Sequence, residues 1–334
     1  MPTACLPASS TRRLADCLTG GLRVELDLTP KPGLVDRRDS GSHPDLTHGV
    51  MDRSITLLDG YFADYAGALE AGAGAAGLRR LGMAAEARMS ARFGTNTHRG
   101  AIFLGGVLLA GLHRAASRDE TSVSHAIGGF ALELFADRVP AGTTGARVRA
   151  RYGVGGIVAE TLDGLPCVFR TGLPALREAR QRLWPRDRAL YLLMARLMRT
   201  VEDTTALRRC GPAGLARLRR DGARLEERLL AGLDPVPFLV EANDDYRRQR
   251  LTMGGVADLI GTCAAWASFT GLWGAGPRHA GAKAEPAPRR RLPGPGSRPG
   301  DQFPLVCRMP DSLVTGASAK SLAANKGREP GVQP

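Results

Sequence analysis

The clearest hydrophobic pattern in the chain lies at 187–201, where apolar side chains recur at intervals of three and four residues. This spacing places them on one face of an α-helix, because the helix completes a turn in about 3.6 residues. We therefore predict an amphipathic helix with a core-facing stripe of apolar side chains: Leu190, Leu193, Met194, Leu197, Met198 and Val201.

Weaker forms of the same pattern, separated by glycine and proline, predict helices along most of the first 274 residues. The stretch near 100–112 is apolar on every side, which is typical of a helix buried at the centre of a domain. A break at Gly211-Pro212 should separate two helices. The predicted helices cover 9–26, 46–69, 75–92, 101–112, 121–138, 187–201, 213–231, 238–250 and 255–272.

No run of alternating β-branched residues is long enough to predict a strand. The chain is therefore expected to form one all-α, multi-helix domain over residues 1–274, with a buried central helix. Beyond Gly274, proline, glycine, arginine and serine dominate, and such a segment buries too little apolar surface to offset its loss of conformational entropy. Residues 275–334 are expected to be a disordered tail.

The formal charge of +13 is unevenly distributed. Ten Lys and Arg and four Asp and Glu follow Gly274, so the tail carries +6 and the first 274 residues carry +7. A moderately basic domain suits a polyanionic small molecule as readily as it suits nucleic acid. The basic run in the tail could contact nucleic acid or acidic lipid, but a solvated tail is the commoner case.

The longest apolar run, Gly254–Trp273, approaches the length of a membrane span. Asp258 and four glycines within it favour a buried core helix instead. The six cysteines form no Cys-x-x-Cys pair, and no signal-like apolar stretch lies near Met1. Reduced thiols and a cytoplasmic location are therefore expected, with neither a membrane nor nucleic acid as a partner.

A loop at 28–45 concentrates ionisable side chains. Pro30, Pro32 and Gly33 surround Lys31 and prevent a continuous helix, because proline lacks an N–H and disfavours helical backbone in the preceding residue. Cations, carboxylates and an imidazole together suit a phosphorylated substrate and a hard metal ion. An ordinary surface loop could carry the same side chains: Lys31, Asp36, Arg37, Arg38, Asp39, His43 and Asp45.

A second polar cluster, Thr95-Asn-Thr-His-Arg-Gly100, precedes the apolar stretch at 101–112. Free N–H groups and the helix dipole make the start of a helix a natural anion site, and Arg99 adds a permanent charge. The alternative is an ordinary N-cap formed by either threonine, with His98 satisfied in the core.

Three carboxylates stand out by their position. Asp203 follows the stripe at 187–201, Asp258 lies one turn into an otherwise apolar helix, and Glu160 has a similar apolar setting. A buried carboxylate needs a cation or several donors, so each is either a functional group or a residue at a helix end. The Gly72-Ala-Gly-Ala-Ala-Gly77 motif follows a helical pattern rather than a strand, and no P-loop motif exists, so a dinucleotide-binding fold is not expected.

Four segments, in this order, resemble the triphosphoribosyl-dephospho-CoA synthase family: Leu28–Asp36, Asn96–Phe103, Asp203-Thr204, and Gly254-Gly255 with Ala257-Asp258-Leu259. The resemblance covers about residues 10–273, and the first two segments are long and specific. The stretch from Tyr152 to Pro166 and the arginine at position 99 are similar to the malonate decarboxylase branch rather than the citrate lyase branch. Thr205 departs from the family pattern, in which we expect asparagine.

The family activity implied is the reaction of ATP with 3′-dephospho-CoA to give the 2′-(5″-triphosphoribosyl) derivative and free adenine. The resemblance implies inversion at the ribose carbon through an oxocarbenium-like state. Such a step needs a carboxylate base for the incoming hydroxyl and a proton donor for the departing adenine. It also needs cations, with Mg²⁺ expected, on the triphosphate.

Within this resemblance we assign roles to single residues as hypotheses. The expected catalytic residues are Asp36, His98, Asp203 and Glu160. Asp36 and Asp203 are also the expected metal ligands. The expected substrate-binding residues are Lys31, Arg37, His43, Asn96, Thr97, Arg99, Gly100, Thr204, Gly254, Gly255 and Asp258. Four of the named side chains, Lys31, Asp36, His98 and Asp203, should converge on one cleft.

Two other functions remain open. A helical metal-dependent nucleotide or ADP-ribose hydrolase would use similar carboxylates with water as the acceptor. A basic helical scaffold that binds nucleic acid or an acidic carrier protein would need no active site. For the transferase, the expected substrates are ATP and 3′-dephospho-CoA, and the product would pass to a second transferase that modifies a carrier protein.

Overall fold

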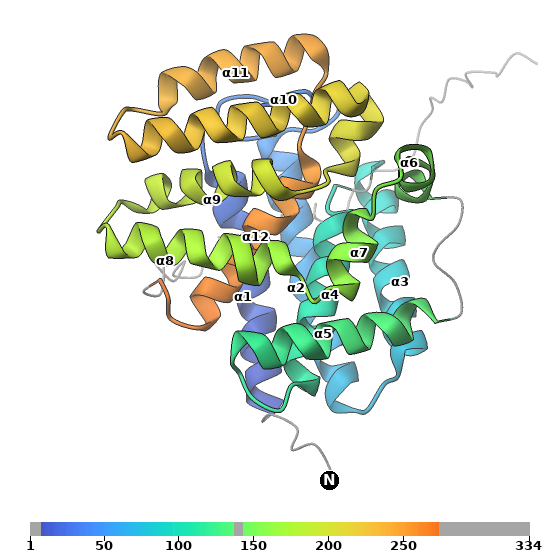
Figure 1. Cartoon of the computed structure of the whole chain (residues 1–334). Helices are drawn as coiled ribbons and strands as arrows, with labels where there is room; N and C mark the ends of the chain where they lie inside the picture. Colours follow the sequence, from blue (N-terminus) through green and yellow to red (C-terminus); the bar gives the residue numbers. More distant parts are fainter. Residues whose placement is uncertain (1–7, 96, 137–142, 274–334) are drawn as a thin grey trace, which may run out of the picture. The chain divides into compact units, whose positions relative to one another are not determined.

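The described part of the computed structural model is all helical, as the sequence predicts (Figure 1). It comprises residues 8–95, 97–136 and 143–273. Within these ranges twelve α-helices and one π-helical segment, η1, follow one another, and no strand is present. Their bounds are α1 Ala8–Asp27, α2 His48–Glu70, α3 Ala75–Phe93, α4 Arg99–Arg114, α5 Glu120–Phe135, α6 Thr144–Tyr152, α7 Gly156–Leu162, η1 Cys167–Gly172, α8 Leu173–Gln181, α9 Arg186–Thr200, α10 Thr204–Leu230, α11 Val236–Gln249 and α12 Gly254–Phe269.

The predicted helices are present, and the last two residues of the one predicted at 121–138 lie outside the described residues. The stripe at 187–201 forms α9 and its six apolar side chains are buried, and the stretch near 100–112 forms α4, which is buried throughout 104–112. The helix predicted at 213–231 and the break before it are confirmed inside α10, where Gly211 has non-helical backbone angles (φ 61°, ψ −161°). The helical segment from Thr204 to this kink is not predicted by the sequence.

Between α5 and α9 the structure contains four helical segments that the hydrophobic pattern does not predict. They are short: α7 has seven residues, and α6 and α8 have nine each. A segment of two turns carries too few apolar positions to establish a helical period. Glycines with positive φ at positions 153, 156 and 164 reverse the chain between them, a conformation that residues with a side chain rarely adopt.

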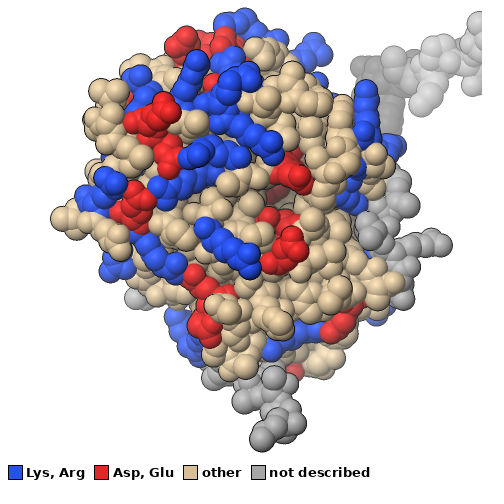
Figure 2. Space-filling view, in the orientation of Figure 1, with Lys and Arg blue, Asp and Glu red and all other residues tan. Residues whose placement is uncertain are grey.

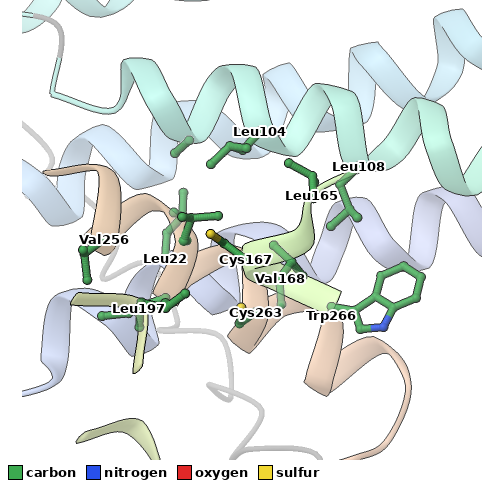
Figure 3. Packing of buried hydrophobic residues seen from close by; sticks show 14 of the residues in the cluster. Leu22, Leu104, Leu108, Leu165, Cys167, Val168, Leu197, Val256, Cys263 and Trp266 are labelled. Carbon is green, nitrogen blue, oxygen red and sulfur yellow. The ribbon is translucent and has the colours of Figure 1, made fainter. Parts of the chain in front are cut away.

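Helix α12 lies in the middle of the described helices, beside α1, α4 and α9 (Figure 1). It crosses α1 closely, because a Cβ on Gly21 would lie 2.3 Å from the carbonyl oxygen of Gly261. Figure 3 shows the apolar core around η1, with labelled side chains that include Leu22, Leu104, Leu197, Val256 and Trp266. The run at 254–273 is therefore a core helix, as predicted.

None of the helices in the described ranges combines the length and the hydropathy that crossing a membrane would require. The described residues all belong to one unit of the chain, which ends at Ala280. The tail predicted at 275–334 lies outside the described residues.

Candidate active site

The starts of α10 and α12 are tied together by one carboxylate. Asp203 caps α10, with Oδ1 accepting hydrogen bonds from the N–H groups of Thr205 and Ala206 at 2.9 and 3.0 Å. Its Oδ2 accepts the N–H of Val256, in the first turn of α12, at 3.1 Å. Asp203 is only 1% exposed. Its carboxylate therefore satisfies two helix ends at once, as an N-cap residue does for a single helix.

Thr205 strengthens the same connection. Its hydroxyl donates to Asp203 Oδ1 at 2.5 Å and accepts the N–H of Gly254 at 2.9 Å. The residue that departs from the family pattern thus takes part in the hydrogen bonds that join α10 to α12.

The start of α4 meets α12 at Asp258. The N–H of Ala101 donates to this carboxylate, and a Cβ on Gly100 would lie 1.8 Å from its Oδ2, so only glycine fits there. Burial raises the pKa of the Asp258 carboxyl well above its usual range, and the nearby charges of Glu25 and Asp203 raise it further. The first turns of α4, α10 and α12 therefore converge around two carboxylates.

Lys31 is fully buried in an ion pair that the sequence analysis did not foresee. Its Nζ donates to Glu25 Oε1 at 2.6 Å and to the Glu25 carbonyl oxygen at 2.5 Å. Glu25 lies near the end of α1 and is 7% exposed. Burial raises the pKa of Glu25, and the positive charge of Lys31 opposes that rise. Position 25 falls inside the predicted helix 9–26, where a lone glutamate carries no signal of this role.

Asp36 holds the 28–45 loop in shape. Its Oδ2 accepts the N–H of Lys31 at 2.8 Å, and its Oδ1 accepts the N–H groups of Arg38 and Asp39 at 2.7 and 3.2 Å. The side chain of Asn243 on α11 clamps the same loop, accepting the N–H of Gly33 and donating to Asp39 at 2.9 Å each. The loop is a fixed structure, as the prolines predict.

His98 is buried at the start of α4. Its Nδ1 lies 2.8 Å from Ser54 Oγ and 2.9 Å from Thr97 Oγ1. Burial lowers the pKa of His98 to about 4, and the positive charge of Lys31 contributes. The imidazole is therefore neutral at neutral pH.

We expect His98 to make the protein sensitive to acid. The unfolded chain binds a proton at the ordinary pKa of 6.5, whereas the folded pKa is about 4. Between these values the unfolded state binds more protons, so folding stability falls as the pH drops from 6.5 toward 4. His98→Gln should reduce the stability difference between pH 7 and pH 4.5 by about 2 kcal/mol, measured by urea unfolding.

His125→Gln, at an exposed histidine of α5, is the matched control and should leave that pH dependence unchanged. An equal acid sensitivity in His98→Gln and the unaltered protein would show that another group causes it.

The remaining predicted residues lie nearer the surface. Arg37 is 62% exposed and pairs with Asp27 at 2.8 Å, and Arg99 is 54% exposed and pairs with Glu86 at 3.2 Å. His43 Nε2 lies 3.0 Å from Thr252 Oγ1, and burial lowers its pKa to about 4. The predicted contact Asn96 lies outside the described residues.

A cavity of about 410 Å³ lies between α7, the α9–α10 connection and the start of α12. Figure 2 shows a hollow on this face, bordered by acidic side chains, with basic side chains over the helices above it. Three of the predicted site residues line the cavity: Glu160, Thr204 and Gly255. Asp163 and Glu202, which were not predicted as site residues, line it as well.

Glu160 is the one predicted catalytic carboxylate that lines this cavity. Its Oε1 accepts the N–H of Cys167 at 2.7 Å. Burial raises the pKa of Glu160, and the negative charge of Asp163 adds to the rise, so its carboxyl keeps a proton to higher pH than usual. A carboxyl group of this kind is a candidate for proton transfer.

The four side chains expected in one cleft lie below the surface. Lys31, Asp36, His98 and Asp203 are at most 4% exposed, and none of them lines the cavity. Gly255 and Thr204 separate the cavity from Asp203, whose Oδ2 would be 3.1 Å from a Cβ on Gly255. The predicted residues therefore divide into a buried network and a cavity beside it.

A metal ion finds no ready set of ligands here. Among the described residues, no three His, Cys, Asp or Glu side chains are grouped to hold one. The carboxylates of Asp36 and Asp203 are buried and accept backbone N–H groups, as described above. The metal role predicted for them stays a prediction, and these hydrogen bonds weigh against it.

Comparison with known proteins gives a consistent result. A family model described as "ATP:dephospho-CoA triphosphoribosyl transferase" matches residues 11–276. Among similar proteins, the probable 2-(5''-triphosphoribosyl)-3'-dephosphocoenzyme-A synthase of Pseudomonas putida is 34% identical over 77% of this chain and 96% of its own length. Proteins of the same name from Pseudomonas aeruginosa and Stutzerimonas stutzeri are 36% and 37% identical, over 78% and 75% of this chain and 92% and 90% of their own. No solved structure was found to match.

Proposed function

Because the chain belongs to the ATP:dephospho-CoA triphosphoribosyl transferase family, we propose that it transfers the triphosphoribosyl group of ATP to 3′-dephospho-CoA. In this reaction the 2′-hydroxyl of dephospho-CoA attacks the anomeric carbon of the ATP ribose. The new carbon–oxygen bond forms while the bond to adenine N9 breaks, and the triphosphate stays on the ribose. The electron pair of the broken bond leaves with adenine.

Two proton transfers accompany this exchange. The attacking hydroxyl must lose its proton to a base, and the departing adenine must gain one. Glu160 supports the proposal because it is a predicted catalytic carboxylate, it lines a cavity, and burial raises its pKa, which favours a role in proton transfer.

The observation that carries the proposal is the meeting of the matching segments at one place. Thr204 and Gly255 come from two segments of the resemblance, 51 positions apart in sequence, and both line the cavity with Glu160. The Asn96–Phe103 segment reaches the same region through Gly100, which packs against Asp258. The Leu28–Asp36 segment is connected to this region through Glu25, which pairs with Lys31 and lies close enough to Asp258 to raise its pKa.

The triphosphate carries enough negative charge to bring Mg²⁺ with it. Mg²⁺ usually keeps several waters and binds substrate phosphates with one or two carboxylates, so a preformed cage is not required. We propose Mg²⁺ as the counter-ion of ATP, and none of the proton transfers above depends on it.

We further propose that the product serves the carrier protein of malonate decarboxylase rather than that of citrate lyase. Residues 152–166 and Arg99 support this branch through their resemblance to its members. The product would then pass to a transferase that attaches it to the carrier protein. A cytoplasmic location agrees with the free thiols of the four described cysteines.

The decisive test mixes the purified full-length protein with ATP and Mg²⁺, with and without 3′-dephospho-CoA. We expect adenine release only when both substrates are present, with a product whose mass equals their sum less adenine. Release of adenine or phosphate from ATP alone would instead favour the nucleotide hydrolase. No release under either condition would contradict both enzymatic functions.

A further inference from the structure

The charged side chains that line the cavity beside Glu160 are all acidic. Three carboxylates line it, those of Glu160, Asp163 and Glu202, and none of its described lining residues is Lys or Arg. A triphosphate placed in that space would face like charges with no cation to offset them. The cavity therefore does not suit the phosphate chain of ATP.

The same lining suits a purine nucleoside. Ile157, Val201 and Leu259 provide apolar walls for a flat base. Carboxylate oxygens accept hydrogen bonds from the amino group of adenine and from ribose hydroxyls, which are donors. The volume of about 410 Å³ is within the range of small-molecule sites.

A cation lies at the edge of this cavity. The side chain of Arg149, on α6, packs against Gly156, where an added Cβ would lie 3.6 Å from its Cγ and Cδ. Gly156 itself lines the cavity. Burial lowers the pKa of Arg149, and no carboxylate among the described residues pairs with it. Its guanidinium can therefore bind an anionic group of a ligand.

We infer that ATP is divided between these two places: the cavity takes the adenosine moiety, and Arg149 at its edge takes the phosphate next to the ribose. This inference rests on the proposed function and adds the orientation of ATP and one binding residue to it. The anomeric carbon would then lie at the mouth of the cavity, where the second substrate can reach it from outside.

The inference can be tested by calorimetric binding of adenosine, ATP and inorganic tripolyphosphate to the full-length protein. We expect adenosine to bind one site and tripolyphosphate not to displace it. Ala159→Leu, which fills the cavity, should weaken adenosine binding at least tenfold. Arg149→Ala should weaken ATP at least tenfold and leave adenosine unchanged. Arg147→Ala, at an exposed arginine of the same helix, is the matched control and should change neither.

Competition between tripolyphosphate and adenosine would overturn the inference, as would equal losses of ATP and adenosine affinity in Arg149→Ala. A measurement that needs no variant guards against misfolding of Ala159→Leu. Light-activated 2-azidoadenosine should label the unaltered protein within 155–167, 200–204 or 255–259, and a label confined to another segment would contradict the assignment.

The two proposals fail differently. If the unaltered protein forms the product but adenosine binds or labels elsewhere, only the orientation of ATP is wrong. If it forms no product from ATP and dephospho-CoA, the proposed function fails, whatever adenosine does.

Discussion

Replacing Glu160 with Gln is expected to slow adenine release by about 10²–10⁴-fold while the fold is retained, which is the usual effect of losing a general acid or base. The amide keeps an oxygen that can accept the N–H of Cys167, so the local hydrogen bond survives. The variant loses only the ability to exchange a proton. The measurement is the rate of adenine release with both substrates saturating, with thermal unfolding as a check on the fold.

The pH profile tells which proton Glu160 moves. Its pKa is raised, so as a general acid it would support activity at low pH, and activity would be lost as the pH rises through that pKa. As a base it would show the opposite limb, with activity lost as the pH falls through the same pKa. Either limb should disappear in Glu160→Gln. Glu241→Gln, at an exposed glutamate of α11, is the control, and near-normal turnover by Glu160→Gln would remove this residue from the mechanism.

Replacing Lys31 with Met should destabilise the folded protein by about 3–5 kcal/mol. Methionine fills a similar volume, but Glu25 then remains buried without its cation, whose Nζ lies 2.6 Å away in the native pair. Adding Glu25→Gln removes the unpaired charge, so the double variant should be more stable than Lys31→Met alone. The measurement is the free energy of unfolding in urea at neutral pH, for the unaltered protein, for Lys31→Met and for the double variant.

An ion pair between the same loop and the end of α1 is the matched control. Arg37 pairs with Asp27, and their side chains are 62% and 40% exposed, so Arg37→Ala should cost no more than about 1 kcal/mol. A loss of similar size in Arg37→Ala and Lys31→Met would mean that burial does not set the strength of the Lys31 pair. A double variant no more stable than Lys31→Met would show that Glu25 tolerates the loss of Lys31.

The buried network and the cavity suggest different duties for the residues of the family pattern. Lys31 donates to Glu25, and the carboxylates of Asp36 and Asp203 accept backbone N–H groups. In contrast, Glu160 and Thr204 line the cavity. The segments that match best along the sequence therefore include residues that shape the site as well as residues placed to meet a substrate.

The sequence by itself determined the helices and the family. Apolar side chains repeated every three or four residues are enough to predict α9, because the helical period is a local property. An apolar stretch without a polar face is enough to predict α4 as a buried helix. The short segments α6 to α8 were not predicted, since two helical turns between glycines contain too few residues to show a period. The segments around Lys31 and His98 identified the family because they are long runs of specific residues.

Only the tertiary structure decided which charges meet. Glu25 partners Lys31 across a turn of chain, and Asp203 joins α10 to α12 over more than fifty positions of sequence. Neither contact produces a repeating pattern in the sequence, because each depends on how the helices pack rather than on where they begin. Burial depends on the same packing. Asp36 is buried and Glu160 lines the cavity, and the sequence alone does not tell a buried carboxylate from one that can meet a substrate.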